Sequence, residues 1–163
     1  MSPIERVRAF FTERQSNLTI IEMDDDTSTA QLAARALGTE VGQIAKSILF
    51  KTKQNKYVMV ISAGDVRVDT RAMKELVGSK VRMATSEEVE EMTGYSIGGV
   101  CPFALPHPIS IYLDESLKRY GVTYAAAGTS NTAVPTSFDQ LQNVTGGIPC
   151  LVTLPSEWGE KCL

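Results

Sequence analysis

Three segments of the sequence combine residue types that could perform chemistry, and the first is centred on Lys46. This lysine interrupts an otherwise largely apolar run over residues 44–50. An unpaired ammonium is costly to bury, so Lys46 lies either at the mouth of a cleft or on the solvent side of a strand. Alternation exposes half of the side chains of any strand, so the lysine alone does not decide between the two.

The second segment, residues 95–103, contains the paired glycines Gly98 and Gly99 and then Pro102. Paired glycines let the backbone approach a ligand closely and present its amides, and the proline stiffens the exit of the loop. Amides fixed in this way can hold an ester carbonyl or a developing oxyanion. A plain tight turn is the alternative. Neither a phosphate-binding loop nor a dinucleotide fingerprint is present.

The third segment is a stretch of small residues, 125–127, that runs into Gly128. Four hydrogen-bonding side chains follow, Thr129, Ser130, Asn131 and Thr132. Small residues on a strand leave room for a ligand to lie against it, whereas an ordinary polar turn would explain the same residues.

The residues on which many enzymes rely are scarce. There is one histidine, His107, and the three cysteines at positions 101, 150 and 162 form neither a CxxC pair nor an even-numbered framework. We therefore expect no metal and no cofactor. Cys101 could act as a nucleophile only with a base, and His107 lies between prolines in a predicted surface loop.

Composition favours one globular domain spanning residues 1–163. The chain has 16 basic and 19 acidic residues and a formal charge of −3, which argues against coating nucleic acid through bulk charge but permits a local contact. No apolar run approaches the roughly 18 residues of a bilayer span, and the N-terminus lacks the features of a signal peptide. We therefore expect a cytoplasmic protein with no membrane partner.

The periodicity of apolar residues and the capping residues predict an α+β fold, because helices and strands are mixed without strict alternation. Helices are expected over residues 2–14, 30–37, 69–77, 85–93, 114–120 and 138–144. Strands are expected over residues 18–22, 44–50, 57–62, 109–113, 122–127 and 148–154. Residues 96–108 are predicted to be irregular.

Taken together, these segments resemble one protein family. The order AARALG at residues 33–38, QIAKS at 43–47, MTGY at 92–95, GGVCPF at 98–103 and AG at 127–128 resembles the YbaK and prolyl-tRNA-synthetase-associated editing domain family. The resemblance extends over about residues 20–147. Its most specific parts are the lysine of QIAKS and the Gly-x-x-x-Pro loop.

The resemblance implies a single α+β domain with a mixed, partly barrel-like sheet flanked by helices. It also implies an aminoacyl-tRNA deacylase that hydrolyses the ester of a mischarged tRNA in trans. The expected substrate is proline tRNA carrying Cys, Ala or another small amino acid, and the expected partners are the tRNA acceptor end and prolyl-tRNA synthetase. A non-catalytic tRNA- or synthetase-binding module that keeps the cleft is the main alternative, and a thiol enzyme using Cys101 is the third.

The resemblance also implies roles for individual residues. Lys46 is expected to be the essential cleft lysine that holds a phosphate or ester oxygen of the terminal adenosine, and the loop is expected to bind the ester end. Because an aminoacyl ester is already labile, we expect backbone amides to suffice as oxyanion donors. The predicted catalytic residues are Lys46, Gly99, Val100 and Cys101. The predicted substrate-binding residues are Ser47, Gly98, Pro102, Gly128, Thr129, Ser130 and Asn131.

A contact with tRNA also needs positive charge near the cleft. The basic residues nearby in sequence are Lys51, Lys53, Lys56, Arg67, Arg71, Lys74, Lys80 and Arg82. Ser47 stands where we expect asparagine in the alanine-specific branch of the family, which argues weakly against that branch.

Overall fold

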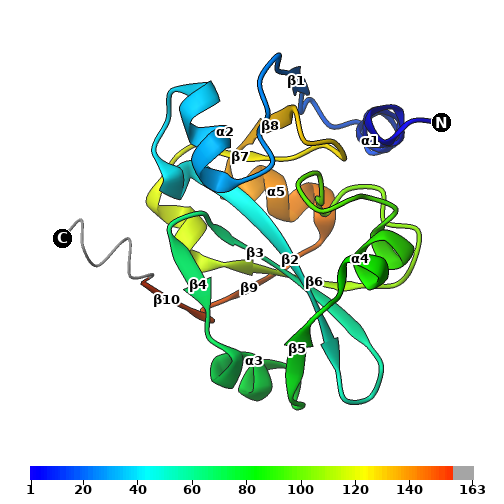
Figure 1. Cartoon of the computed structure of the whole chain (residues 1–163), viewed down its shortest axis with the longest axis vertical. Coiled ribbons are helices and arrows are strands. Elements are labelled where there is room, and N and C mark those ends of the chain that lie inside the picture. Colours follow the sequence, from blue (N-terminus) through cyan, green and yellow to red (C-terminus); the bar gives the residue numbers. More distant parts are fainter. Residues whose placement is uncertain (156–163) are drawn as a thin grey trace.

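A mixed eight-stranded sheet lies at the centre of the computed structural model, which describes residues 1–155 (Figure 1). Its strand order is β1-β8-β7-β2-β3-β6-β9, with β5 pairing beside β2, and β10 pairs with β4 in a separate two-stranded sheet. The strands are β1 (Ile21–Glu22), β2 (Ile44–Thr52), β3 (Tyr57–Ala63), β4 (Val66–Val68), β5 (Val81–Met83), β6 (Ser110–Asp114), β7 (Thr123–Ala125), β8 (Thr132–Thr136), β9 (Ile148–Cys150) and β10 (Thr153–Pro155).

The helices begin and end at residues that the sequence marks clearly. Each α-helix follows an N-cap side chain that accepts a hydrogen bond from the first turn, and four of the five end at a glycine in the left-handed region. The α-helices are α1 (Pro3–Glu13), α2 (Ala30–Leu37), α3 (Thr70–Val77), α4 (Ser86–Thr93) and α5 (Phe138–Thr145). The short helices η1 (Val41–Gln43) and η2 (Glu115–Arg119) are of the 3-10 type.

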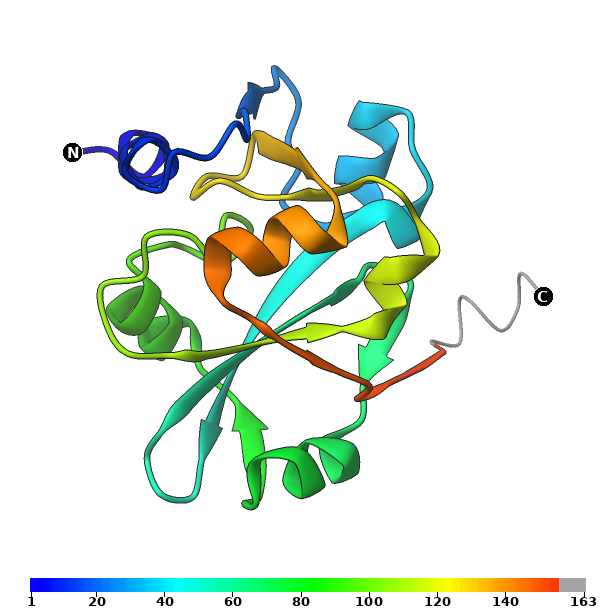
Figure 2. The same cartoon turned by 180° about the vertical axis from the view of Figure 1, so that it is seen from behind.

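The two faces of β2 belong to different parts of the core. Ala45 and Leu49 pack into the large cluster that includes residues of α1, α4 and α5, whereas Phe50 packs with Met73 of α3 and Ile44 packs with α2. In Figure 2, α5 crosses the face of the sheet that is turned toward the viewer, and in Figure 1, α2 lies in front of the sheet. The predicted α+β class, with a mixed sheet flanked by helices, is confirmed.

The differences from the sequence prediction concern short strands. The strands β4, β5 and β8 were not expected, the strand expected over residues 18–22 is reduced to β1, and the one expected over 148–154 is divided into β9 and β10. Strands of two or three residues are too short to show alternation, and Pro135 within β8 argues against a strand. The segment 96–108 is irregular, as predicted.

Two further predictions concern the whole chain. Within residues 1–155, no helix combines the length and the apolar character needed to cross a bilayer. The cytoplasmic location and the single domain over 1–163 remain predictions, and Cys162 lies outside the described residues.

Candidate active site

The candidate site lies at a gap in the sheet beside β2. On one side of this strand, β7 pairs only with Ile44 and Ala45, and β5 pairs only from Phe50 to Thr52. The other side is paired with β3 along residues 45–51. A cavity of about 300 Å³ is lined by β2, by both strands that border the gap, and by segments on either face of the sheet.

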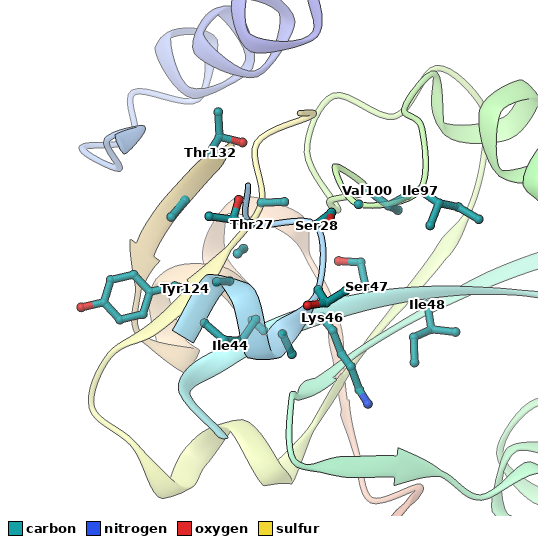
Figure 3. Close-up of a pocket in the computed structure, with 18 of the residues that line it drawn as sticks. Thr27, Ser28, Ile44, Lys46, Ser47, Ile48, Ile97, Val100, Tyr124 and Thr132 are labelled. Atoms are coloured by element: carbon teal, nitrogen blue, oxygen red, sulfur yellow. The ribbon is translucent and has the colours of Figure 1, made fainter. Parts of the chain in front are cut away.

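The wall of this cavity is mostly apolar (Figure 3). Helix α2 contributes Ala30, Ala33 and Leu37, and the irregular loop contributes Ile97, Gly98 and Val100. The remaining lining residues are Thr27, Ser28, Thr29, Ile44, Ala45, Lys46, Ser47, Ile48, Leu49, Met83, Ala84, Val89, Tyr124, Ala125, Ala126, Thr132 and Ala133. The limited volume fits a small organic group.

Lys46 lies in the cavity wall with a half-buried side chain, and this position favours the cleft interpretation over the solvent-exposed one. Its Nζ donates a hydrogen bond of 2.5 Å to the carbonyl of Val66, the first residue of β4. Figure 3 shows the side chain directed from β2 toward this neighbouring strand. Burial lowers the pKa of Lys46, and the nearby carboxylate of Asp65 acts in the opposite direction.

An ion pair supports the turn that receives Lys46. The guanidinium of Arg119 donates to both carboxylate oxygens of Asp65, at 2.5 and 3.0 Å. Asp65 directly precedes Val66, so this bidentate contact stabilises the position of the carbonyl that binds Lys46. Neither charged residue belongs to a recognisable motif, and sequence reasoning missed both.

Two of the predicted segments meet through their main chains. The amide of Gly128 donates to the carbonyl of Gly99 at 2.9 Å. A Cβ atom on Gly99 would lie 2.6 Å from the carbonyl carbon of Gly128, so a side chain there would force the two segments apart. Gly98 has a φ of +100° and faces Ser28. The glycines therefore let the loop pack closely against its neighbours.

The amides of this loop differ in their availability. The amide of Gly99 donates to the carbonyl of Ser96 at 3.0 Å, so it is already engaged within the loop. Within the described chain, the amides of Val100 and Cys101 donate to no acceptor. Val100 lines the cavity. Cys101 does not line the cavity and has no exposed surface, so the predicted set of oxyanion donors is reduced to the Val100 amide.

The thiol of Cys101 is enclosed in the core. Its residue has no exposed surface, and burial raises the pKa of the thiol to about 12. A nucleophilic cysteine needs an accessible thiolate, so this environment opposes the thiol alternative. His107 is exposed and does not line the cavity.

The predicted binding residues Gly128, Thr129, Ser130 and Asn131 do not line the cavity, and neither does Pro102. Ser130 supports the wall from behind instead. The carbonyl of Ser130 accepts from both the amide and the hydroxyl of Thr27, at 2.6 and 2.9 Å. Asn131 holds the chain near β1 through its bond to Met23. The lining residues that take their place are Thr27, Ser28, Thr132 and Ala133.

Ser47 differs from the other hydroxyl residues of the wall. Thr27, Ser28, Thr29 and Thr132 all use their hydroxyls in hydrogen bonds within the described chain. The Ser47 hydroxyl is buried and has no partner there. In Figure 3, its side chain extends on the side of β2 that faces the loop.

The charged side chains around the cavity form a modest basic surface. In residues 1–155, no group of three or more His, Cys, Asp or Glu side chains is arranged to hold a metal ion. Lys51 and Arg82 are bound to Glu88, at 3.2 and 2.8 Å. Their charges are partly neutralised, while the other basic residues named above are exposed around the hairpin, α3, β4 and β5.

Comparison with known proteins identifies this architecture. A solved structure of a protein provisionally described as a trans-editing enzyme for prolyl-tRNA synthetase superposes with a TM-score of 0.88 and 35% identity, covering 94% of this chain and 98% of that one. A protein of Enterococcus faecalis, provisionally named a Cys-tRNA(Pro)/Cys-tRNA(Cys) deacylase, is 25% identical over 124 residues, covering 76% of each chain.

Part of a much larger enzyme is also similar. The proline–tRNA ligase of Bacillus pumilus is 38% identical over 103 residues, which are 63% of this chain and only 18% of the ligase. The aminoacyl-tRNA editing domain family matches residues 24–144, and this segment contains the cavity and every predicted site residue. The chain belongs to the aminoacyl-tRNA editing domain family.

Proposed function

We propose that this protein is a trans-editing deacylase that hydrolyses the ester of proline tRNA mischarged with a small amino acid. The observation that carries the proposal is the cavity at the gap in the sheet, because it brings Lys46 and the glycine-containing loop to one small apolar chamber. Family membership and the similarity to part of a proline–tRNA ligase support the choice of reaction and tRNA.

In this proposal, Lys46 carries the positive charge of the site. Its ammonium, held by the Val66 carbonyl, binds a phosphate or ester oxygen of the terminal adenosine. The amide of Val100 stabilises the oxyanion that forms when water attacks the ester carbonyl. The ester C–O bond then breaks, the ribose oxygen takes a proton, and the free amino acid leaves.

In this proposal, the size of the cavity determines which aminoacyl groups are hydrolysed. Seven alanines and Gly98 are among the residues of the wall, and about 300 Å³ accommodates a small aminoacyl group. Fit alone discriminates side chains that differ by one methylene only about 10- to 200-fold. We therefore propose small amino acids as a class, with cysteine, alanine and serine as the first to test.

The test is a deacylation assay with purified proline tRNA charged with cysteine, alanine or serine. We expect the parent protein to cleave at least one of them and Lys46→Ala to lose most of that activity. Lys118→Ala, which removes an exposed lysine of η2 outside the cavity wall, is the matched control and should keep the parent rate.

Two outcomes would contradict the proposal. Unchanged rates in Lys46→Ala would remove the lysine from the mechanism. A parent protein that binds these charged tRNAs but cleaves none of them would instead be the non-catalytic module.

A further inference from the structure

The gap beside β2 leaves main-chain groups without a strand partner. On this side of β2, the ladder with β7 ends at Ala45 and the ladder with β5 begins at Phe50. The amide of Ala84 donates to the carbonyl of Leu49 at 2.9 Å, just beyond the end of that second ladder. Between these ladders, no strand of the described chain pairs with Ser47 from this side.

The direction in which the peptide groups of β2 point follows from the hydrogen bonds that this segment makes on its β5 side. There, the carbonyl of Leu49 accepts from Ala84, and the amide of Lys53 donates to the carbonyl of Lys80. Main-chain groups of a strand point to the same side at every second residue. The amide and carbonyl of Ser47 therefore point into the gap, away from β3.

The amide and carbonyl of Ser47 face a cavity wall that offers them few hydrogen-bond partners. Much of the cavity wall is aliphatic, and the other serine and threonine hydroxyls that line it are already engaged. A donor and an acceptor that face an apolar chamber are unfavourable unless water or a ligand satisfies them. Ser47 therefore adds an unpaired amide, carbonyl and hydroxyl to the unpaired amide that Val100 presents to the cavity.

We propose that the main chain of Ser47 binds the aminoacyl end of the substrate. Its carbonyl accepts a hydrogen bond from the α-amino group, and its amide donates one to the ester carbonyl. An aminoacyl ester carries the amino and carbonyl groups of a single residue, which are the groups that an antiparallel strand offers to its neighbour. This inference rests on the proposed function and adds to it a contact common to all aminoacyl groups.

The first experiment varies the substrate. Proline tRNA is charged with alanine, serine or cysteine, and separately with the matching acid that lacks only the amino group: propionic, 3-hydroxypropionic or 3-mercaptopropionic acid. Rates are divided by the spontaneous hydrolysis rate of each ester, because the amino group itself makes an ester more labile. For each aminoacyl ester that is cleaved, we expect the corrected rate to exceed that of its partner at least about tenfold.

The second experiment varies the protein. Ser47→Pro removes the amide proton without breaking a strand ladder, because that amide has no partner. We expect it to lose at least about tenfold in the corrected rate on the best aminoacyl ester. Ser86→Ala removes an exposed serine hydroxyl of α4 that does not line the cavity, so it is the control and should keep the parent activity.

The results of these two experiments can reject the Ser47 contact without rejecting the proposed deacylase function. Cleavage of aminoacyl and des-amino esters at equal corrected rates would overturn the inference and leave the deacylase intact, and so would a folded Ser47→Pro protein with parent activity. If Ser47→Pro does not fold, the substrate pairs still decide. Failure to cleave any of the three aminoacyl esters would reject the proposed function and this inference with it.

Discussion

At the scale of single residues, the protonation of Lys46 sets a pH dependence. Burial lowers its pKa, and the proposed role needs the charged form. Activity should therefore be full at low pH and fall as the pH rises through that lowered pKa. The measurement is the deacylation rate between pH 6 and pH 10, corrected at each pH for spontaneous hydrolysis.

A substitution of Asp65 tests whether Lys46 is the group whose deprotonation causes this decline in activity. Its carboxylate raises the pKa of Lys46, so Asp65→Asn should move the alkaline decline to lower pH. A decline that stays at the same pH in Asp65→Asn would show that another group controls it.

For Cys101, in contrast to Lys46, we predict that substitution has little effect on activity. Because its thiol is fully enclosed and its pKa is raised to about 12, Cys101→Ser should keep the deacylation rate within a few-fold of the parent. The substitution should still lower the thermal midpoint, because it places a hydroxyl in an apolar core. Complete loss of turnover in a folded Cys101→Ser protein would revive the thiol mechanism.

At the scale of elements, the contact between Gly99 and Gly128 holds two segments together. A methyl group on Gly99 would lie 2.6 Å from the Gly128 carbonyl carbon, so Gly99→Ala should displace the loop. Overpacking of this kind costs about 1–3 kcal/mol. Urea unfolding should show that loss, and deacylation should fall with it.

Gly121→Ala is the matched control for this prediction. Nothing lies within 4 Å of the position of its Cβ, and its backbone is outside the left-handed region. Equal stability of the two variants would contradict the proposed role of the close contact.

Some elements of the fold could be predicted from the sequence alone, whereas the arrangement of strands around β2 could not. Helix α4 was predictable because Thr85 and Glu88 form a capping box and Gly94 ends the helix, which are local signals. The loop glycines were recognised as a place of close approach, but their partner could not be inferred from the same signals. The gap beside β2 depends on where β7 stops and β5 starts, and these registers are set by packing across the whole sheet.

At the scale of the whole molecule, the charge of −3 and the sparse basic surface predict a weak dependence on salt. Lys51 and Arg82 share Glu88, and the exposed basic residues of the hairpin, α3, β4 and β5 do not line the cavity, whose wall contains one basic residue, Lys46. A contact limited to two or three phosphates of the single-stranded acceptor end gives a log–log slope of about −2. Deacylation efficiency measured over a range of KCl concentrations checks this value, and a much steeper slope would require a broader tRNA interface.

The interrupted edge of β2 has a consequence for solubility as well. An open strand edge usually invites another polypeptide to add to the sheet, which leads to aggregation. Here the unpaired stretch is centred on one residue, between β7 and β5, and α2 and the glycine-containing loop help to enclose it. An extended chain needs several consecutive residues to form a ladder, so this edge can admit a partner no longer than a single amino acid.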